Sequence, residues 1–217
     1  MDSLQIMIEA IPTLIKGLNL TIQIAVVSII AALIIGLVMG LISLSKNGWI
    51  RVISTIYVDL IRGTPLLIQI LFIYFGIPAV VEIQIPALVA GIIAISINAG
   101  AYMTEIFRAG IESVDRGQME AGRSLGFSYA QTMRLVILPQ AVRRMIPAFV
   151  NQFTTAIKDT SILSSIGIAE LTLQGQSIYA MNYRAFQILT VVAAFYFVII
   201  YILSLVSRWL ERRYAIK

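Results

Sequence analysis

The apolar run 87–107 contains three polar residues at helical spacing, Asn98, Tyr102 and Glu105. Positions i, i+4 and i+7 lie on one face of a helix, so these side chains project together. A polar face on an apolar helix is expected to point into the protein rather than toward lipid. We therefore expect Asn98 and Tyr102 to line a path for a polar solute. Glu105 lies near the end of the run and is expected to pair with Arg108.

A second polar stripe runs through the segment 145–166. It consists of Asn151, Thr155 and Lys158 or Asp159, and it leads into Thr160 and Ser161. Asp159 supplies an acidic group and Lys158 a hydrogen-bond donor that could contact a polar solute. Adjacent helical residues point about 100° apart, so these two side chains need not pair with each other. The alternative is that both fasten neighbouring helices together.

The run 52–75 contains two opposite charges, Asp59 and Arg62, three residues apart. Such a pair can neutralise itself inside a membrane. The segment Gly63-Thr64-Pro65 follows directly, and its proline perturbs a helix. We expect a structural ion pair beside a kink; the alternative is that Arg62 also reaches the solute.

The residue inventory excludes several kinds of chemistry. The chain has no cysteine and no histidine, which excludes disulfides, thiol nucleophiles and the usual zinc sites, and we expect no metal site. It also lacks the G-x-x-x-x-G-K-[ST] loop that cradles nucleotide phosphates, so ATP is expected to bind elsewhere. An intramembrane enzyme is therefore a weak alternative, although Asp59 and Asp159 could be offered as an acid pair.

Composition indicates a membrane protein. Of 217 residues, 59% are hydrophobic and 12% are charged, with a mean hydropathy of +0.91. We predict an all-α membrane protein with a single transmembrane domain over 1–217. The five transmembrane helices are predicted at about 20–44, 52–75, 87–107, 145–166 and 186–207. The preceding segment 4–18 is expected to lie along the outer interface rather than to cross the membrane.

Lysine and arginine are distributed unevenly between the predicted loops. The loop around Lys46 holds two, 108–144 holds six and the tail 208–217 holds four, whereas the other side holds only Lys16 and Arg184. Because cytoplasmic loops are enriched in these residues, we predict an outside N-terminus and a cytoplasmic C-terminus. The same orientation explains the net charge of +5 better than nucleic-acid binding does.

The longest predicted cytoplasmic loop, about 108–140, joins the third and fourth spans. Within it, 118–125 and 128–138 are short amphipathic helix candidates, separated by Gly126 and closed by Pro139. This pattern predicts a helix-turn-helix parallel to the membrane. From spacing alone, the alternative is an interfacial hairpin that only joins two spans.

The loop also resembles a known motif. Glu120-Ala121, then Gly126, then Ile137-Leu138-Pro139 are similar to the EAA loop of permease subunits in binding-protein-dependent ABC importers. Four further stretches resemble the polar amino acid permease family of histidine, arginine and glutamine type, in order along the chain: YVDLIRGTPLLIQILFIYFGIP, AYMTEIFRAGIESVDRGQ, VILPQAVRRMIP and IKDTSILSSIGIAEL. The ordered series covers most of the chain, which makes the resemblance specific.

The resemblance implies that this loop is a coupling-helix loop that docks on an ABC ATPase. The residues that it assigns to the contact are Glu120, Ala121, Gly122, Arg123, Leu125, Gly126 and Phe127. It further implies a pair of ATPase subunits that hold ATP and Mg²⁺, a second permease subunit that is either a copy or a paralogue, and a solute-binding protein outside. The chain itself would carry no cofactor and would import a polar amino acid across a prokaryotic inner membrane, surrounded by lipid. The alternative for Glu120 is a solvated helix charge.

Two positions depart from the family pattern. Gly122 stands where a second alanine is frequent, and Asp59 stands where a glutamate is frequent. Glycine is expected to weaken the first coupling helix by about 1 kcal/mol relative to alanine. The alternative function is a secondary amino acid transporter driven by an ion gradient. The residues do not choose one amino acid, since Asp159 favours a cationic substrate and Lys158 favours the opposite.

Overall fold

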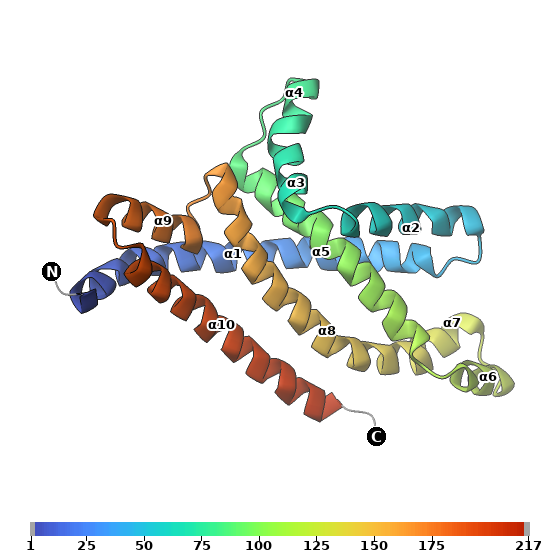
Figure 1. Ribbon diagram of the computed structural model, residues 1–217. Coiled ribbons are helices and arrows are strands. Elements are labelled where there is room, and N and C mark those ends of the chain that lie inside the picture. Colours follow the sequence, from blue (N-terminus) through green and yellow to red (C-terminus); the bar gives the residue numbers. More distant parts are fainter. Residues whose placement is uncertain (1–2, 215–217) are drawn as a thin grey trace.

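The computed structural model describes residues 3–214, and every regular element in that range is helical (Figure 1). In chain order the elements are α1 Ser3–Ser43, α2 Gly48–Arg62, α3 Leu66–Leu71, η1 Phe72–Gly76, α4 Ile77–Val81, α5 Ala87–Glu112, α6 Arg116–Ser124, α7 Tyr129–Thr132, η2 Met133–Ile137, α8 Leu138–Asp159, η3 Thr160–Ile166, α9 Leu171–Asn182 and α10 Ala185–Tyr214. The all-α class predicted from the sequence is confirmed.

Helices α1 and α5 make the most extensive helix pair in the structure. Small residues recur every fourth position of α1, at Ser28, Ala32, Gly36 and Gly40, and all four are buried. A Cβ atom added at Gly36 would lie 2.3 Å from the Cβ atom of Met103 on α5. Close approach of two helix backbones in an apolar environment depends on such small side chains.

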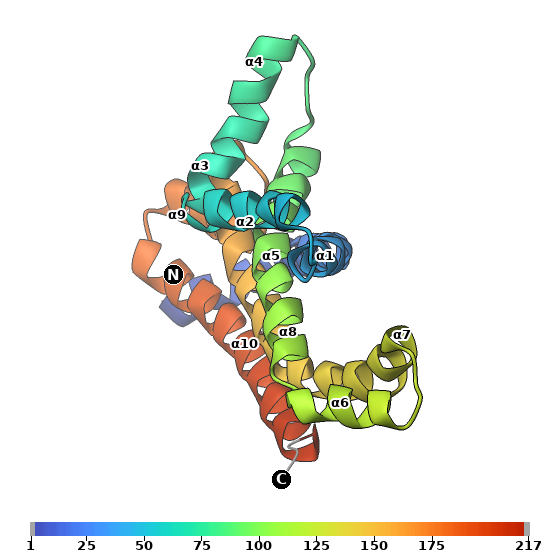
Figure 2. The same ribbon diagram turned by 90° about the vertical axis from the view of Figure 1, so that its right-hand side faces the viewer.

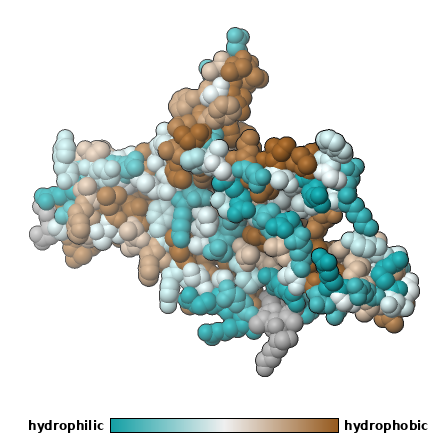
Figure 3. All heavy atoms as spheres, turned by 45° about the vertical axis from the view of Figure 1, so that its right-hand side comes forward, coloured by the Kyte–Doolittle hydropathy of each residue, from teal (hydrophilic) through white to brown (hydrophobic). Residues whose placement is uncertain are grey.

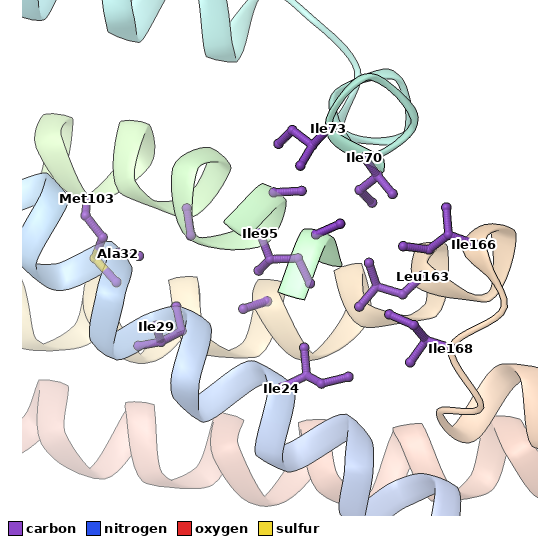
Figure 4. Packing of buried hydrophobic residues seen from close by; sticks show 14 residues of the cluster. Ile24, Ile29, Ala32, Ile70, Ile73, Ile95, Met103, Leu163, Ile166 and Ile168 are labelled. Carbon is purple, nitrogen blue, oxygen red and sulfur yellow. The ribbon is translucent and has the colours of Figure 1, made fainter. Parts of the chain in front are cut away.

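The main core joins segments that are distant in the sequence. Figure 4 shows its side chains meeting between α1, the α3–η1 segment, α5 and η3. The labelled members are Ile24, Ile29, Ala32, Ile70, Ile73, Ile95, Met103, Leu163, Ile166 and Ile168. This packing fixes the start of α5 against the end of α8 and its continuation η3.

Helix α1 differs from the prediction at its N-terminal end. The segment 4–18, expected as a separate interfacial piece, is continuous with the predicted first span in one 41-residue helix that contains Pro12. Ala10 and Leu14 are buried against Leu171 of α9 and Ile188 of α10. The polar residues of this segment suggested a break, but tertiary packing of its apolar face keeps it helical.

Length and apolarity identify three spanning candidates among the described residues, α1, α5 and α10. Helix α2 and the helical segment Leu66–Val81 meet at 102°, and they count as a fourth span if they form one broken crossing. Pro65 stands at this break in an extended conformation, because its ring prevents the helix from continuing. Helix α8 carries charge near both of its ends, so composition does not identify it as a span.

The loop after α1 and the α6–α7 segment lie at one end of the molecule. The Lys46 ammonium lies 5.9 Å from the centre of the Tyr129 ring of α7. Figure 2 shows the end of α10 at the same end as α6, far from the α3–α4 arm. The loops and the tail that the count of lysine and arginine assigns to one side of the membrane thus lie at one end of the molecule. Lys217, which belongs to that count, lies outside the described residues.

A buried glutamate connects three helices at the opposite end. Glu170 caps α9 by accepting hydrogen bonds from the backbone N–H groups of Thr172 and Leu173, both at 2.9 Å. It also accepts from the hydroxyls of Tyr196 on α10 at 3.0 Å and Thr21 on α1 at 3.5 Å. Burial raises the pKa of Glu170, and these hydrogen bonds to its carboxylate oppose the rise. The sequence analysis did not identify this residue.

Candidate functional site

A cavity of about 510 Å³ lies between the end of α2, the second half of α5 and the middle of α8. We call it the α5–α8 cavity. Its polar lining consists of Arg62, Tyr102, Glu105, Ser113, Arg144, Asn151 and Gln152. Figure 3 shows a band of hydrophilic residues across the middle of one face, below the apolar α3–α4 arm. Two residues predicted to line a solute path, Arg62 and Tyr102, meet here.

Glu105 is the acidic group of this cavity, and it pairs with Arg108. Arg108 donates hydrogen bonds of 3.2 and 2.8 Å to the two oxygens of Glu105, and one of 2.7 Å to Glu112. The predicted Glu105–Arg108 pair is thus present. Arg108 itself is not part of the cavity lining, so it balances the charge of Glu105 from outside.

Arg62 points toward α5 rather than along its own helix. Its Nη1 atom is 3.9 Å from Glu105, and its guanidinium carbon is 5.1 Å from the centre of the Tyr102 ring. Within the described residues no ion pair joins Arg62 to Asp59, so the predicted Asp59–Arg62 pair is wrong. The helix ends immediately after Arg62, at Gly63, and the side chain can therefore turn across to the neighbouring helix.

Asn98 is engaged in holding the break between α2 and α3. Its amide donates a 3.0 Å hydrogen bond to Gln69. Gln69 in turn donates to the backbone oxygens of Ile61 at 2.7 Å and Thr64 at 3.1 Å. The sequence analysis missed Gln69, although a glutamine four residues after a helix-breaking proline is a suitable donor for carbonyls that the break leaves unpaired.

The other predicted path residues lie outside the α5–α8 cavity, at the end of α8 and in η3. Asp159 is half-buried and Lys158 is exposed, and neither forms an ion pair within 4.0 Å in the part of the chain described here. Thr155 and Ser161 donate to backbone oxygens of their own helical segment, at 3.1 and 2.7 Å. Within residues 3–214, therefore, no ion pair of Lys158 or Asp159 supports the alternative that these two side chains hold neighbouring helices together.

The segment 116–132 forms the predicted pair of short helices, which we call the α6–α7 hairpin. Asp115 caps α6 by accepting from the backbone of Gly117 at 2.7 Å, and Ser128 and Gln131 form a reciprocal capping box on α7. Gly126 between them has a φ of +86°, a left-handed conformation that glycine adopts without strain. The hairpin is therefore ordered by its own local bonds.

Arg123 donates a 2.9 Å hydrogen bond to the carbonyl of Phe127 and so closes the turn of the hairpin. The sequence prediction was wrong about the end of the second helix. Pro139 does not end the second helix, because it follows directly on the π-helical turn η2 and the helix continues through it as α8. The chain is consequently helical without interruption from α7 through η2 and α8.

The departure at Gly122 also has a structural reason. Gly122 is buried, and a Cβ atom added there would lie 2.4 Å from the Cγ2 atom of Thr132. The two helices of the hairpin therefore touch where the glycine lies. The remaining predicted contact residues are exposed, with Leu125 at 78% and Phe127 at 37%, and Glu120, Ala121 and Arg123 also face outward.

Comparison with known proteins explains this combination of apolar helices, hairpin and polar cavity. Residues 32–216 match the family described as binding-protein-dependent transport system inner membrane component. The chain belongs to this family. It is a multi-pass membrane protein and the permease component of an ABC importer, as the sequence predicted, and not an ion-driven secondary transporter.

Individual relatives of this permease cover nearly its whole length. It is 45% identical over 209 residues to the glutamine transport system permease protein GlnP of Escherichia coli (strain K12), covering 95% of each chain. It is 36% identical over 206 residues to the arginine transport system permease protein ArtQ of Bacillus subtilis (strain 168), covering 95% of this chain and 94% of that one. Its homologues are thus amino acid permeases.

Solved structures give the same result. The permease superimposes with a TM-score of 0.93 on a chain from an amino acid ABC transporter solved with histidines, at 40% identity and over 98% of this chain and 99% of that one. An inward-facing MetNI methionine ABC transporter matches with a TM-score of 0.79 at 20% identity, over 93% and 96% of the chains. The second likeness shows a common fold alone.

Proposed function

We propose that this permease imports a polar amino acid by alternating access, driven by ATP hydrolysis on two ABC ATPase subunits that hold ATP and Mg²⁺. A second permease subunit and an external solute-binding protein complete the assembly in the prokaryotic inner membrane. The single transmembrane domain crosses the bilayer five times, with the fourth crossing formed by α8 and η3, and places its C-terminus in the cytoplasm. The positive-inside rule supports this orientation, because it collects the basic loops at the end where Lys46 contacts Tyr129.

The α6–α7 hairpin is the observation that carries the proposal. A segment that transmits movement from an ATPase subunit to the permease must keep its shape. This hairpin is capped at both helices, closed by Arg123 and packed through Gly122. Its outer surface presents the charge of Glu120 beside the apolar side chains of Leu125 and Phe127. Apolar anchors with a nearby charge suit a docking contact with an ATPase subunit. We assign Glu120, Ala121, Arg123, Leu125 and Phe127 to that contact.

Asp159 and Lys158 are our candidates for the groups that hold the zwitterion. Both stand where α8 changes into η3, and no partner within the described residues neutralises either of them by an ion pair. Asp159 would receive the ammonium group and Lys158 the carboxylate, with Thr155 and Ser161 on the same stretch. Asn98 would act through Gln69, by keeping the α2–α3 break in place beside the path.

Glutamine is the first substrate to test. The relative with 45% identity is a glutamine permease, and the relative with 36% identity is an arginine permease. A path that carries both Lys158 and Asp159 provides no net charge to favour a cationic side chain, and this balance suits an uncharged polar side chain such as the amide of glutamine.

The test is reconstitution of the permease in liposomes with its partner ATPase and solute-binding protein. We expect ATP-dependent uptake of labelled L-glutamine, and loss of that uptake in Glu120→Lys and Gly126→Pro, because proline cannot adopt the positive φ of Gly126. Glu211→Lys on exposed α10 and Gly48→Pro at the first turn of α2 are matched controls that should transport normally. Normal uptake in both hairpin variants would contradict the coupling role.

The role of Asp159 is tested in the same preparation. Asp159→Asn keeps the shape of the side chain and removes its charge, and losing a charge-assisted hydrogen bond of about 1.5–3 kcal/mol should weaken apparent affinity roughly 10- to 150-fold. The complex should assemble at the wild-type yield. Unchanged affinity would remove Asp159 from the path, and a complex that falls apart would assign it a structural role.

A further inference from the structure

Another cavity, of about 520 Å³, lies between the first turns of α1, the end of α9 and the start of α10. We call it the α1–α9 cavity. Figure 1 shows these three helix ends together on the side of the molecule away from the α6–α7 hairpin. Its lining includes the apolar Ile6 and Ile178 and the polar Glu9, Asn182 and Arg184. None of these residues lines the α5–α8 cavity, so the two cavities are separate places in the fold.

The α1–α9 cavity holds one group of each charge. Glu9 of α1 and Arg184 before α10 are both exposed, and within residues 3–214 neither forms an ion pair within 4.0 Å. The amide oxygen of Asn182 accepts a 2.9 Å hydrogen bond from the backbone N–H of Arg184, which leaves the NH₂ group of the same side chain as a further donor. An arginine fork suits a phosphate, and a carboxylate suits a primary ammonium group. The cavity therefore matches a ligand that carries both groups.

The surroundings of the cavity are typical of a membrane surface. Only 11% of the most apolar window of α10 is buried, so most of this helix is available to lipid. At its start Phe186 is 80% exposed, and just before it Met181 and Tyr183 are 77% and 90% exposed. Aromatic side chains gather at the level of lipid headgroups. The α1–α9 cavity therefore lies beside the headgroups of the leaflet that the proposed orientation places outside.

We propose that the α1–α9 cavity binds the headgroup of a phosphatidylethanolamine molecule in the outer leaflet. Arg184 and Asn182 donate hydrogen bonds to its phosphate, and Glu9 accepts one from its ammonium group. Ile6 and Ile178 pack against the buried cluster that joins α1, α9 and α10, so a lipid held over them connects the same three helices. The volume of the cavity is in the usual range for a small-molecule site. The inference rests on the proposed orientation and on no step of transport.

Two related phospholipids differ from this ligand in the group that faces Glu9. Phosphatidylcholine keeps the positive charge, but its three methyl groups leave no N–H to donate to the carboxylate. Phosphatidylglycerol keeps the phosphate and has no ammonium group, so its negative charge is not balanced beside Glu9. The cavity should therefore prefer phosphatidylethanolamine to both.

Native mass spectrometry of the assembled transporter in detergent counts the lipids that are bound to it. Each of the three phospholipids, with the same acyl chains, is titrated alone, and the dissociation constant of the tightest site is measured. The test variants are Glu9→Gln and Arg184→Gln. Their matched controls, Glu82→Gln and Lys16→Gln, remove the same charges from exposed positions outside the cavity. Comparison of each variant with its control separates the cavity from lipids that the partner subunits bind.

We expect the wild-type complex to bind phosphatidylethanolamine about tenfold more tightly than either other lipid, because its hydrogen bond to Glu9 is charge-assisted. Glu9→Gln should reduce the preference over phosphatidylcholine to about twofold or less. Arg184→Gln should weaken both of these lipids alike by about tenfold, because both lose the phosphate contact. The two controls should keep the wild-type constants. Glycerophosphoethanolamine, the same headgroup without acyl chains, should not bind at the same concentrations.

Equal affinity of the wild-type complex for phosphatidylethanolamine and phosphatidylcholine would overturn the inference. A preference that survives Glu9→Gln, or binding unchanged by Arg184→Gln, would do the same. Equally tight binding of glycerophosphoethanolamine would assign the cavity to a soluble zwitterion instead. Unchanged lipid binding with weaker attachment of the loaded solute-binding protein would assign it to that protein.

ATP-dependent uptake is measured separately, in liposomes, and it keeps this test apart from the proposed function. Uptake together with any of the contrary lipid results removes the headgroup site alone. Absence of uptake in the wild-type complex, with the expected lipid preference, contradicts the proposed function alone.

Discussion

Replacing Gly122 by alanine tests whether the α6–α7 hairpin acts as a rigid body. Gly122 lies in the last turn of α6, where alanine is the better helix former by about 1 kcal/mol. The new methyl group would lie 2.4 Å from Cγ2 and 2.9 Å from Oγ1 of Thr132. Thr132 is fully buried, and its hydroxyl donates to the carbonyl of Ser128 at 3.1 Å, so it has little freedom to move away.

The two effects have opposite signs, and their sizes decide the result. Overpacking of a well-packed contact costs about 1–3 kcal/mol, so a typical 2 kcal/mol less the 1 kcal/mol gained in helix propensity leaves Gly122→Ala destabilised by about 1 kcal/mol. Thr132→Ser removes the closest atom, Cγ2. In the double variant the 2.4 Å overlap is gone and the 2.9 Å approach to Oγ1 remains, so relief of most of the overpacking should appear as a favourable coupling energy of about 1–2 kcal/mol.

Hydrogen exchange of the α6 amides, read by mass spectrometry on the permease in lipid nanodiscs, measures this local stability. Gly122→Ala should speed exchange about fivefold, and adding Thr132→Ser should reverse the change. The single variant Thr132→Ser is the control for loss of the methyl group. Slower exchange in Gly122→Ala, unaffected by Thr132→Ser, would refute the packing argument and leave Gly122 as a simple weakness of the helix.

Three further predictions concern the topology and the buried contacts. A single cysteine at Ser128 should react with an impermeant thiol reagent only from the cytoplasmic side and one at Gln174 only from outside; reaction of both from one side would contradict the five-span arrangement. Gly36→Leu should lower the melting temperature of the purified permease by roughly 10 °C, because it forces α1 from α5 at a cost of about 3 kcal/mol, whereas Gly48→Leu, with open space around its Cβ position, should melt normally. Glu170→Ala should destabilise the permease by about 2 kcal/mol or more through loss of the α9 cap and of the Tyr196 partner, and an unchanged melting curve would show that the connection of α1, α9 and α10 does not depend on it.

Local sequence patterns predicted the elements whose structure is decided locally. The helical class follows from hydropathy, and the α6–α7 hairpin follows from two short amphipathic stretches separated by Gly126. Where tertiary contacts decide, prediction from the sequence was wrong. The charges of the segment 4–18 suggested an interfacial helix, but packing of Leu14 against α9 and α10 makes it part of α1. The glutamate at position 170 looked like an ordinary loop residue, because its partners on α1 and α10 are about 150 positions before it and 26 positions after it.

The polar residues of α5 and α8 show why helical spacing alone gave an incomplete site. Periodicity tells which residues share a face, and it grouped Asn98 with Tyr102 and Asn151 with Asp159. It does not tell which neighbouring residues each one meets. Tyr102 contacts Arg62 at the α5–α8 cavity, whereas Asn98, one turn earlier on α5, donates a hydrogen bond to Gln69. A continuous polar stripe in the sequence is thus divided in the structure into two places, one near Asp159 at the end of α8 and one at the α5–α8 cavity.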